Sequence, residues 1–207
     1  RGLMSSFVEL ILTLPVWLIF ASALLQMGRL LFSLAGYPFM DEMEEGCYSF
    51  GLGAAVLATG IWGLGLLSAI GPWTVGALSA AVLGLWFATF RSFMAWLTSF
   101  WRHLKALFTF QSGFELFLAW VAALSLLITL VAIGSPQIGR DALAYHFYCP
   151  KEFIQKGAVD PIPYSVNALQ PLLIQMLYLQ GLLFNSEVFS KVYNLGFLLA
   201  CAGVMTS

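Results

Sequence analysis

Long apolar runs constrain this chain more than any other feature. They cover about residues 7–27, 48–70, 73–90, 114–133, 169–184 and 188–207. A helix needs about 20 apolar residues to cross a bilayer, and most of the runs have that length. None shows the strict alternation of apolar and polar residues that is typical of a membrane β-barrel strand. The sequence therefore predicts an all-α membrane protein with about six transmembrane helices.

Composition supports this prediction and narrows the possible partners. Hydrophobic residues make up 60% of the chain and charged residues 9%, whereas a soluble domain carries about 25% charged residues. The formal net charge of −1 creates no long-range field, so neither nucleic acid nor an acidic partner is suggested. Membrane lipid is the partner that the apolar composition predicts. The three cysteines, Cys47, Cys149 and Cys201, are scattered without a CxxC pair, so we expect neither a disulfide framework nor a structural metal site.

Residues 1–207 read as a single transmembrane region. The first residue is Arg1 and the last, Ser207, falls inside an apolar run. We therefore expect this region to be the N-terminal part of a longer polytopic protein.

The first half of the chain predicts a solvated connector and a helical hairpin. Asp41, Glu42, Glu44 and Glu45 lie between the first two runs, and so many carboxylates predict a loop in water. The second and third runs carry small residues at four-residue spacing, which would let two helix backbones approach closely. These stripes are Gly51, Ala55, Thr59 and Gly63, then Gly76, Ala80, Gly84 and Ala88.

Residues 91–108 predict an amphipathic helix that lies flat in the cytoplasmic interface. Phe93, Trp96 and Phe100 would share its apolar face, and Arg102 and Lys105 its polar face. Aromatic and basic residues are typical of helices at this depth.

The count of six predicted spans assigns each connection between them to one side of the membrane. This amphipathic helix, the acidic connector and the turn at Asn185 would share one side, so that Cys47 and Cys149 would lie near opposite faces. Lysine and arginine are divided five against four between the two sides, which leaves the orientation open under the positive-inside rule.

Residues 134–168 form the one long polar segment. Asp141 is a suitable N-cap for a short surface helix, which would bend at Pro150 and end at Gly157. At helical spacing, one face of that helix would carry the side chains of Asp141, Tyr145, Tyr148 and Glu152. Basic and imidazole groups accompany that face, namely Arg140, His146, Lys151 and Lys156.

This segment resembles the first extracytoplasmic loop of the bacterial polytopic C-type (GT-C) glycosyltransferases. The resemblance rests on RDALAYHFYCPKEFIQKG, on the following P-x-P-Y-S and on the helix start near Pro171. The D-A-L-x-Y-H core is Asp141 to His146, and residues 28–53 also look like that group. The resemblance implies a multi-pass enzyme of the bacterial inner membrane that takes a sugar from a polyprenyl-phosphate donor.

The resemblance also implies roles for particular residues. Asp141 matches the essential loop carboxylate, which would act as a base or help to hold a divalent metal. Ala142 replaces the second acidic residue of the family's pair, so no cofactor is predicted and a divalent metal is left open. The substrate-binding residues would be Arg140, Tyr145, His146 and Lys151, with the basic groups placed for a lipid phosphate.

A second interpretation stays open beside the enzyme. The chain would then be a non-catalytic structural or accessory subunit that packs against partner membrane subunits, and Asp141 would only cap a helix. Haem binding is disfavoured because His103 and His146 lie outside the apolar runs. Transport is disfavoured because the runs are nearly free of charge.

Overall fold

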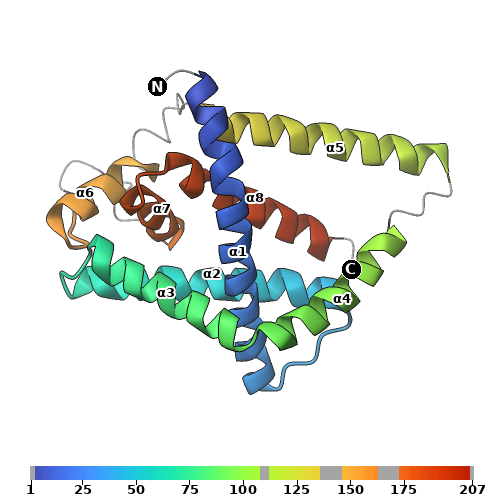
Figure 1. The fold of residues 1–207 in the computed structure, drawn as a ribbon, viewed down its shortest axis with the longest axis horizontal. Helices are drawn as coiled ribbons and strands as arrows, with labels where there is room; N and C mark the ends of the chain where they lie inside the picture. Colours follow the sequence, from blue (N-terminus) through green and yellow to red (C-terminus); the bar gives the residue numbers. More distant parts are fainter. Residues whose placement is uncertain (1–2, 108–111, 136–145, 163–172, 206–207) are drawn as a thin grey trace.

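The structure is a computed structural model that describes residues 3–107, 112–135, 146–162 and 173–205. Within these ranges the chain forms helices and no strand (Figure 1). Helices α1, α2, α5 and α8 are long and apolar enough to cross a membrane. The prediction of an all-α, multi-pass membrane protein is therefore confirmed. The helices are α1 (Leu3–Ala35), α2 (Glu42–Leu66), α3 (Pro72–Ala88), α4 (Phe90–Leu107), α5 (Gly113–Gly134), α6 (Tyr148–Lys156), α7 (Leu173–Leu183) and α8 (Glu187–Val204).

The described residues hold four candidate spans, or five if α3 and α4 are taken together, fewer than the six expected. Helices α3 and α4 meet at a bend of 73°. The described part of the run at 169–184 is α7, with 11 residues. At 1.5 Å per residue α7 is about 16 Å long, half the thickness of a hydrocarbon core.

The acidic cluster is helical, and the prediction of a loop at this point is wrong. Helix α1 continues to Ala35, and α2 begins at Glu42 with Asp41 as its N-cap. The Asp41 carboxylate accepts from the backbone N–H of Glu44, and the Glu44 carboxylate accepts from that of Met40, both at 2.8 Å. Carboxylates stabilise a helix start because they satisfy free N–H groups and face the positive end of the helix dipole.

Helices α1 and α2 cross with their backbones in contact. A Cβ atom built on Gly28 would lie 1.9 Å from the carbonyl oxygen of Ser49, and one on Gly53 would lie 1.9 Å from that of Leu24. Only glycine fits at these positions, so this glycine pair permits the closest helix contact in the bundle.

The predicted close packing of α2 and α3 through their small-residue stripes is wrong. A Cβ atom at Gly51, Gly63, Gly76 or Gly84 would meet no atom within 4 Å. The alanines of the α3 stripe, Ala80 and Ala88, are exposed. The stripes therefore face away from the protein, toward the surrounding lipid.

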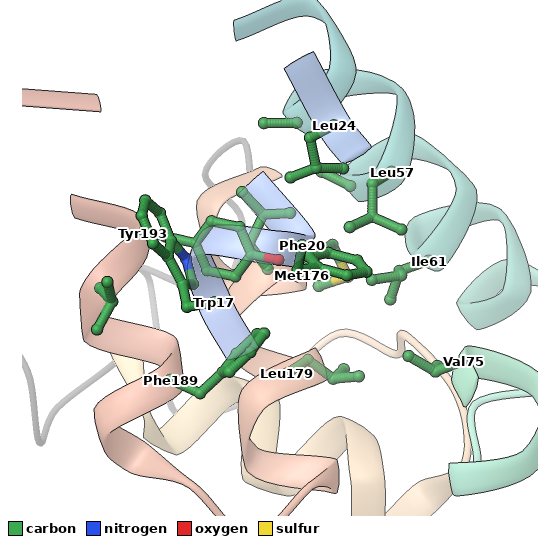
Figure 2. Packing of buried hydrophobic residues seen from close by; sticks show 14 of the residues in the cluster. Trp17, Phe20, Leu24, Leu57, Ile61, Val75, Met176, Leu179, Phe189 and Tyr193 are labelled. Atoms are coloured by element: carbon green, nitrogen blue, oxygen red, sulfur yellow. The ribbon is translucent and has the colours of Figure 1, made fainter. Parts of the chain in front are cut away.

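The core lies where α1, α2, α7 and α8 meet (Figure 2). Trp17 of α1 sits at its centre, with ring contacts to Phe50 and Tyr193 at centroid distances of 6.4 Å. Leu57 and Met176 are fully buried beside it. The described part of α7 thus packs inside the bundle.

The bundle has two ends, which we name after α6 and α4. The α6 end holds α6, the α2–α3 turn and the N-terminus of α8; the α4 end holds α4 and the N-terminus of α2 (Figure 1). Lys151 of α6 pairs with Glu187 of α8 at 3.2 Å. The turn at Asn185 therefore lies at the α6 end, and the prediction that it shares a side with α4 is wrong, because the Lys151–Glu187 pair joins the N-terminus of α8 to α6.

Helix α4 is amphipathic, as the sequence indicates. Phe93 and Trp96 are buried, whereas Arg91, Arg102 and Lys105 are exposed. Its position in a bilayer interface stays a prediction.

Candidate functional site at the α6 end

The structure describes two of the five predicted site residues. Arg140, Asp141 and Tyr145 fall outside the described ranges, whereas His146 and Lys151 lie at the start of α6. Both therefore belong to the α6 end of the bundle, just beyond the segment that carries Asp141.

Helix α6 has clear start and stop signals. It begins at Tyr148, which places Pro150 in the first turn, where a missing backbone N–H costs no helical hydrogen bond. The expected bend at Pro150 is therefore not needed. Gly157 ends α6 in the left-handed region at φ 70°, as the sequence predicts, because glycine takes up this conformation without strain.

Two backbone hydrogen bonds hold the end of α6 on the α2–α3 turn. The N–H of Ile70 donates to the carbonyl of Gly157 at 2.8 Å, and the N–H of Val159 donates to that of Gly65 at 3.1 Å. A Cβ atom on Gly65 would lie 2.3 Å from the Val159 side chain. We call this set of contacts the α6 clamp.

His146 is half-buried against α7. The amide of Gln175 contacts its Nδ1 atom at 3.4 Å, and the Tyr178 ring lies edge-on at 6.1 Å. Phe147 stacks on the same Tyr178 ring at 5.4 Å. If the amide donates, Nδ1 accepts and the neutral imidazole carries its proton on Nε2.

Lys151 lies beside a polar hollow between α6 and the α7–α8 turn. This hollow has a volume of about 460 Å³ and is lined by Lys151, Gln155, Asn185 and Glu187 among others. The Lys151 and Glu187 side chains are both about half exposed, so their pairing contributes little to stability. The ammonium group can therefore exchange this partner for an anionic ligand at small cost.

Tyr148 and Glu152 share one face of α6, in agreement with the predicted spacing. The Glu152 carboxylate raises the pKa of the Tyr148 phenol, because a nearby negative charge disfavours the phenolate. The phenol therefore stays protonated, and its side chain is hydrogen-bonded to Glu152.

A buried polar network behind His146 is the part of the site that sequence reasoning missed. Gln180 donates to Ser79 at 2.7 Å and accepts from Tyr193, which joins α3, α7 and α8. Tyr178 donates to Asn194 at 2.7 Å. The available signal was the pair of glutamines in an otherwise apolar run, because buried amides need partners.

Lys191 fixes the point at which the polar segment leaves the bundle. Its ammonium group, on α8, donates to the carbonyls of Ile133 at 3.2 Å and Ser135 at 2.6 Å. These carbonyls end α5, where the helix dipole favours a positive charge. The segment that carries Asp141 therefore starts from a fixed position at the α6 end.

The described part of the α6 end offers the Lys151 ammonium group, together with the polar side chains of the hollow, to an anionic ligand. Among the described residues no three His, Cys, Asp or Glu side chains gather in a metal-ligating group. Comparisons of the chain with protein-family models, with curated proteins and with solved structures find no match. A function can therefore be proposed only from the residues of this chain.

Proposed function

We propose that this chain is a GT-C-like membrane glycosyltransferase of the bacterial cytoplasmic membrane. It would transfer a sugar from a polyprenyl-phosphate-linked donor at the α6 end, as part of cell-envelope synthesis. The observation that carries the proposal is the α6 clamp, because it holds α6, the helix that follows the D-A-L-x-Y-H core in the chain, against the bundle. An enzyme needs this rigidity to position reacting groups.

In the proposed reaction the acceptor hydroxyl oxygen attacks the anomeric carbon of the donor sugar. The bond between that carbon and the phosphate oxygen breaks, and the lipid phosphate leaves with the bond's electrons. Asp141 takes the hydroxyl proton, and the anomeric configuration inverts. Arg140 and Lys151 bind the phosphate, while His146 and Tyr145 contact donor or acceptor groups.

The replacement Asp141→Asn tests the proposal. It keeps the shape and the capping ability of the side chain but removes its basicity, so we expect glycosyl transfer to fall about 10²–10⁴-fold. The measurement is transfer from polyprenyl-phosphate sugars by the full-length protein at matched expression. Asp160→Asn is the control, because Asp160 is exposed and does not line the hollow beside Lys151, so it should leave activity unchanged. Equal activity of Asp141→Asn and wild type would reduce Asp141 to a helix cap.

His146→Ala should act mainly on donor binding. The imidazole is half-buried against α7, and in the proposed reaction it contacts donor or acceptor groups, so we expect the KM for the donor to rise more than kcat falls. Steady-state kinetics at varied donor concentration would measure both. Asp160→Asn, at an exposed residue that does not line the hollow beside Lys151, is the control. A loss in kcat alone would contradict the binding role.

The alternative, a non-catalytic accessory subunit, is favoured by one observation. Almost all side chains of α5 are exposed, and only its C-terminal end is buried in the bundle. Figure 1 shows this helix reaching away from the other helices. Such a surface suits packing against partner helices, and absence of transfer from every polyprenyl-phosphate sugar would favour this function.

A further inference from the structure

The first half of α4 turns its apolar side chains toward the protein. The Trp96 ring lies against α2, where a Cβ atom built on Gly46 would come within 3.0 Å of it. Arg29 of α1 lies over the same ring at 4.9 Å, and Ser99 donates to Glu42 of α2 at 2.6 Å. One face of α4 is thus fixed on α1 and α2, and the opposite face forms part of the surface of the molecule.

The opposite face of α4 carries a row of positive charges. Arg91, Arg102 and Lys105 follow one another at i, i+11 and i+14, a spacing that places them on one side of a helix. All three side chains are exposed, as is Thr98 between them. No residue of α4 is acidic. We call Arg91, Arg102 and Lys105 the α4 stripe.

The acidic side chains at the start of α2 do not neutralise the α4 stripe. Each of these carboxylates accepts a hydrogen bond from another group of the protein, and they belong to Asp41, Glu42, Glu44 and Glu45. Arg102 contacts only the Ser99 hydroxyl, at 3.5 Å, and Lys105 lies over the Trp101 ring at 5.8 Å. Among the described residues no carboxylate forms an ion pair with the α4 stripe, so its charge is available to a partner.

The α4 stripe begins at an exposed hollow with aromatic walls. Helices α3 and α4 meet at a bend of 73°, and a hollow of about 720 Å³ at this bend is lined by Phe87, Phe90, Arg91 and Ser92 among others. Phe87 and Phe90 are exposed, so apolar and positive groups adjoin at one surface. Cations are costly in hydrocarbon, whereas cations beside aromatic side chains are typical of the interface. The α4 stripe is therefore suited to the headgroup layer of the bilayer.

We propose that the α4 stripe binds the headgroups of anionic phospholipids in the membrane around the protein. The headgroup oxygens accept from the guanidinium groups of Arg91 and Arg102 and from the ammonium group of Lys105. Lipid fits the stripe better than an acidic protein does, because exposed aromatic side chains adjoin Arg91 and suit the apolar part of an amphiphile. This surface lies at the α4 end and does not depend on the proposed sugar transfer.

Native mass spectrometry of the protein released from nanodiscs tests this proposal. The nanodiscs contain equal amounts of anionic phosphatidylglycerol and zwitterionic phosphatidylcholine with the same acyl chains. We expect wild type to retain phosphatidylglycerol in preference. The triple variant Arg91→Gln, Arg102→Gln, Lys105→Gln should lower that preference at least tenfold, because one basic residue near an anionic surface contributes about fivefold in affinity.

A second triple variant is the matched control. Met94→Gln, Ala95→Gln and Thr98→Gln change exposed residues of the same helix and remove no charge, so this variant should keep the preference. Melting temperatures in detergent show that both variants are folded. No preference in wild type would overturn the proposal and favour an acidic protein as the partner. Equal preference in wild type and the variant without the three cations would overturn it as well.

Fluorescence energy transfer in nanodiscs locates the preferred lipid. A donor dye on Thr98→Cys, in a background without the native cysteines, lies on the face of the α4 stripe. It should transfer more energy to phosphatidylglycerol with a labelled acyl chain than to phosphatidylcholine with the same label. A donor on Ala123→Cys, at an exposed position of α5, should not distinguish the two lipids. Equal transfer to both lipids from residue 98 would place the preferred lipid elsewhere and overturn the assignment to α4.

Discussion

Two glycines determine how closely α1 and α2 approach. Gly28 and Gly53 face the backbone of the partner helix, and each would place a Cβ atom 1.9 Å from a carbonyl oxygen. Helices in lipid gain little from the hydrophobic effect between them, so close backbone packing supplies much of their association. The same crossing positions Ser49 and Leu24, both fully buried.

Gly53→Ala should destabilise the protein more than Gly51→Ala. The added methyl group at residue 53 must push α1 and α2 apart, and overpacking of this kind costs about 1–3 kcal/mol. At residue 51 the methyl group enters open space, and alanine is the better helix former. Thermal unfolding in detergent measures both variants. Equal melting temperatures would show that the crossing relaxes without cost.

The composition of α2 explains why the sequence did not identify this contact. Small residues occur on several faces of the helix, including Gly51, Gly53, Ala54, Ala58 and Gly63. Periodicity alone cannot tell which face meets another helix and which meets lipid, because both environments are apolar. The apolar runs could be predicted because a membrane-spanning helix is apolar on all its faces. For the same reason the sequence could not show which face packs against another helix.

At the scale of elements, α6 and α7 are the two short helices that shape the candidate site. The end of α6 is held by the α6 clamp, and its buried residues include Cys149 and Phe153. Gly157 could be predicted as the end of α6, because a glycine stop is a local signal. The docking of α6 on Gly65 could not, because it joins segments about ninety residues apart.

Gly65→Leu should release α6 from the bundle. The new side chain would occupy the space of Val159, whereas Gly63→Leu points into open space and serves as the control. The readout is the rate at which a maleimide reacts with the buried Cys149 thiol, in a background with Cys47 and Cys201 replaced by alanine. We expect at least a tenfold faster reaction for Gly65→Leu than for the control. Equal rates would show that the clamp does not hold α6.

At the scale of the whole molecule, the position of the Asn185 turn decides the topology. The chain reaches the α6 end at the close of α5, and α8 also starts there, since Lys151 pairs with Glu187 and Lys191 binds the end of α5. A count of apolar runs treats every run as one crossing. It therefore placed the Asn185 turn on the wrong side, although it assigned the helical class correctly.

Cysteine labelling across intact membranes can test this sidedness. Asn185→Cys and Gln155→Cys both line the hollow at the α6 end, so a membrane-impermeant maleimide should reach them from the same side. Thr98→Cys, exposed on α4, should react only from the opposite side. Labelling of residue 185 together with residue 98 would restore the six-crossing topology.

The α6 clamp has a consequence for biogenesis. Ribosomes deliver a chain from its N-terminus, so α2 and α3 enter the bilayer well before residues 157–159 are made. During that interval the Ile70 N–H group has only water as a partner, because its acceptor, the Gly157 carbonyl, does not yet exist. The α2–α3 turn must therefore remain at the membrane surface until α6 arrives. Maturation of this region is then a late step, and it sets the earliest moment at which the candidate site can assemble.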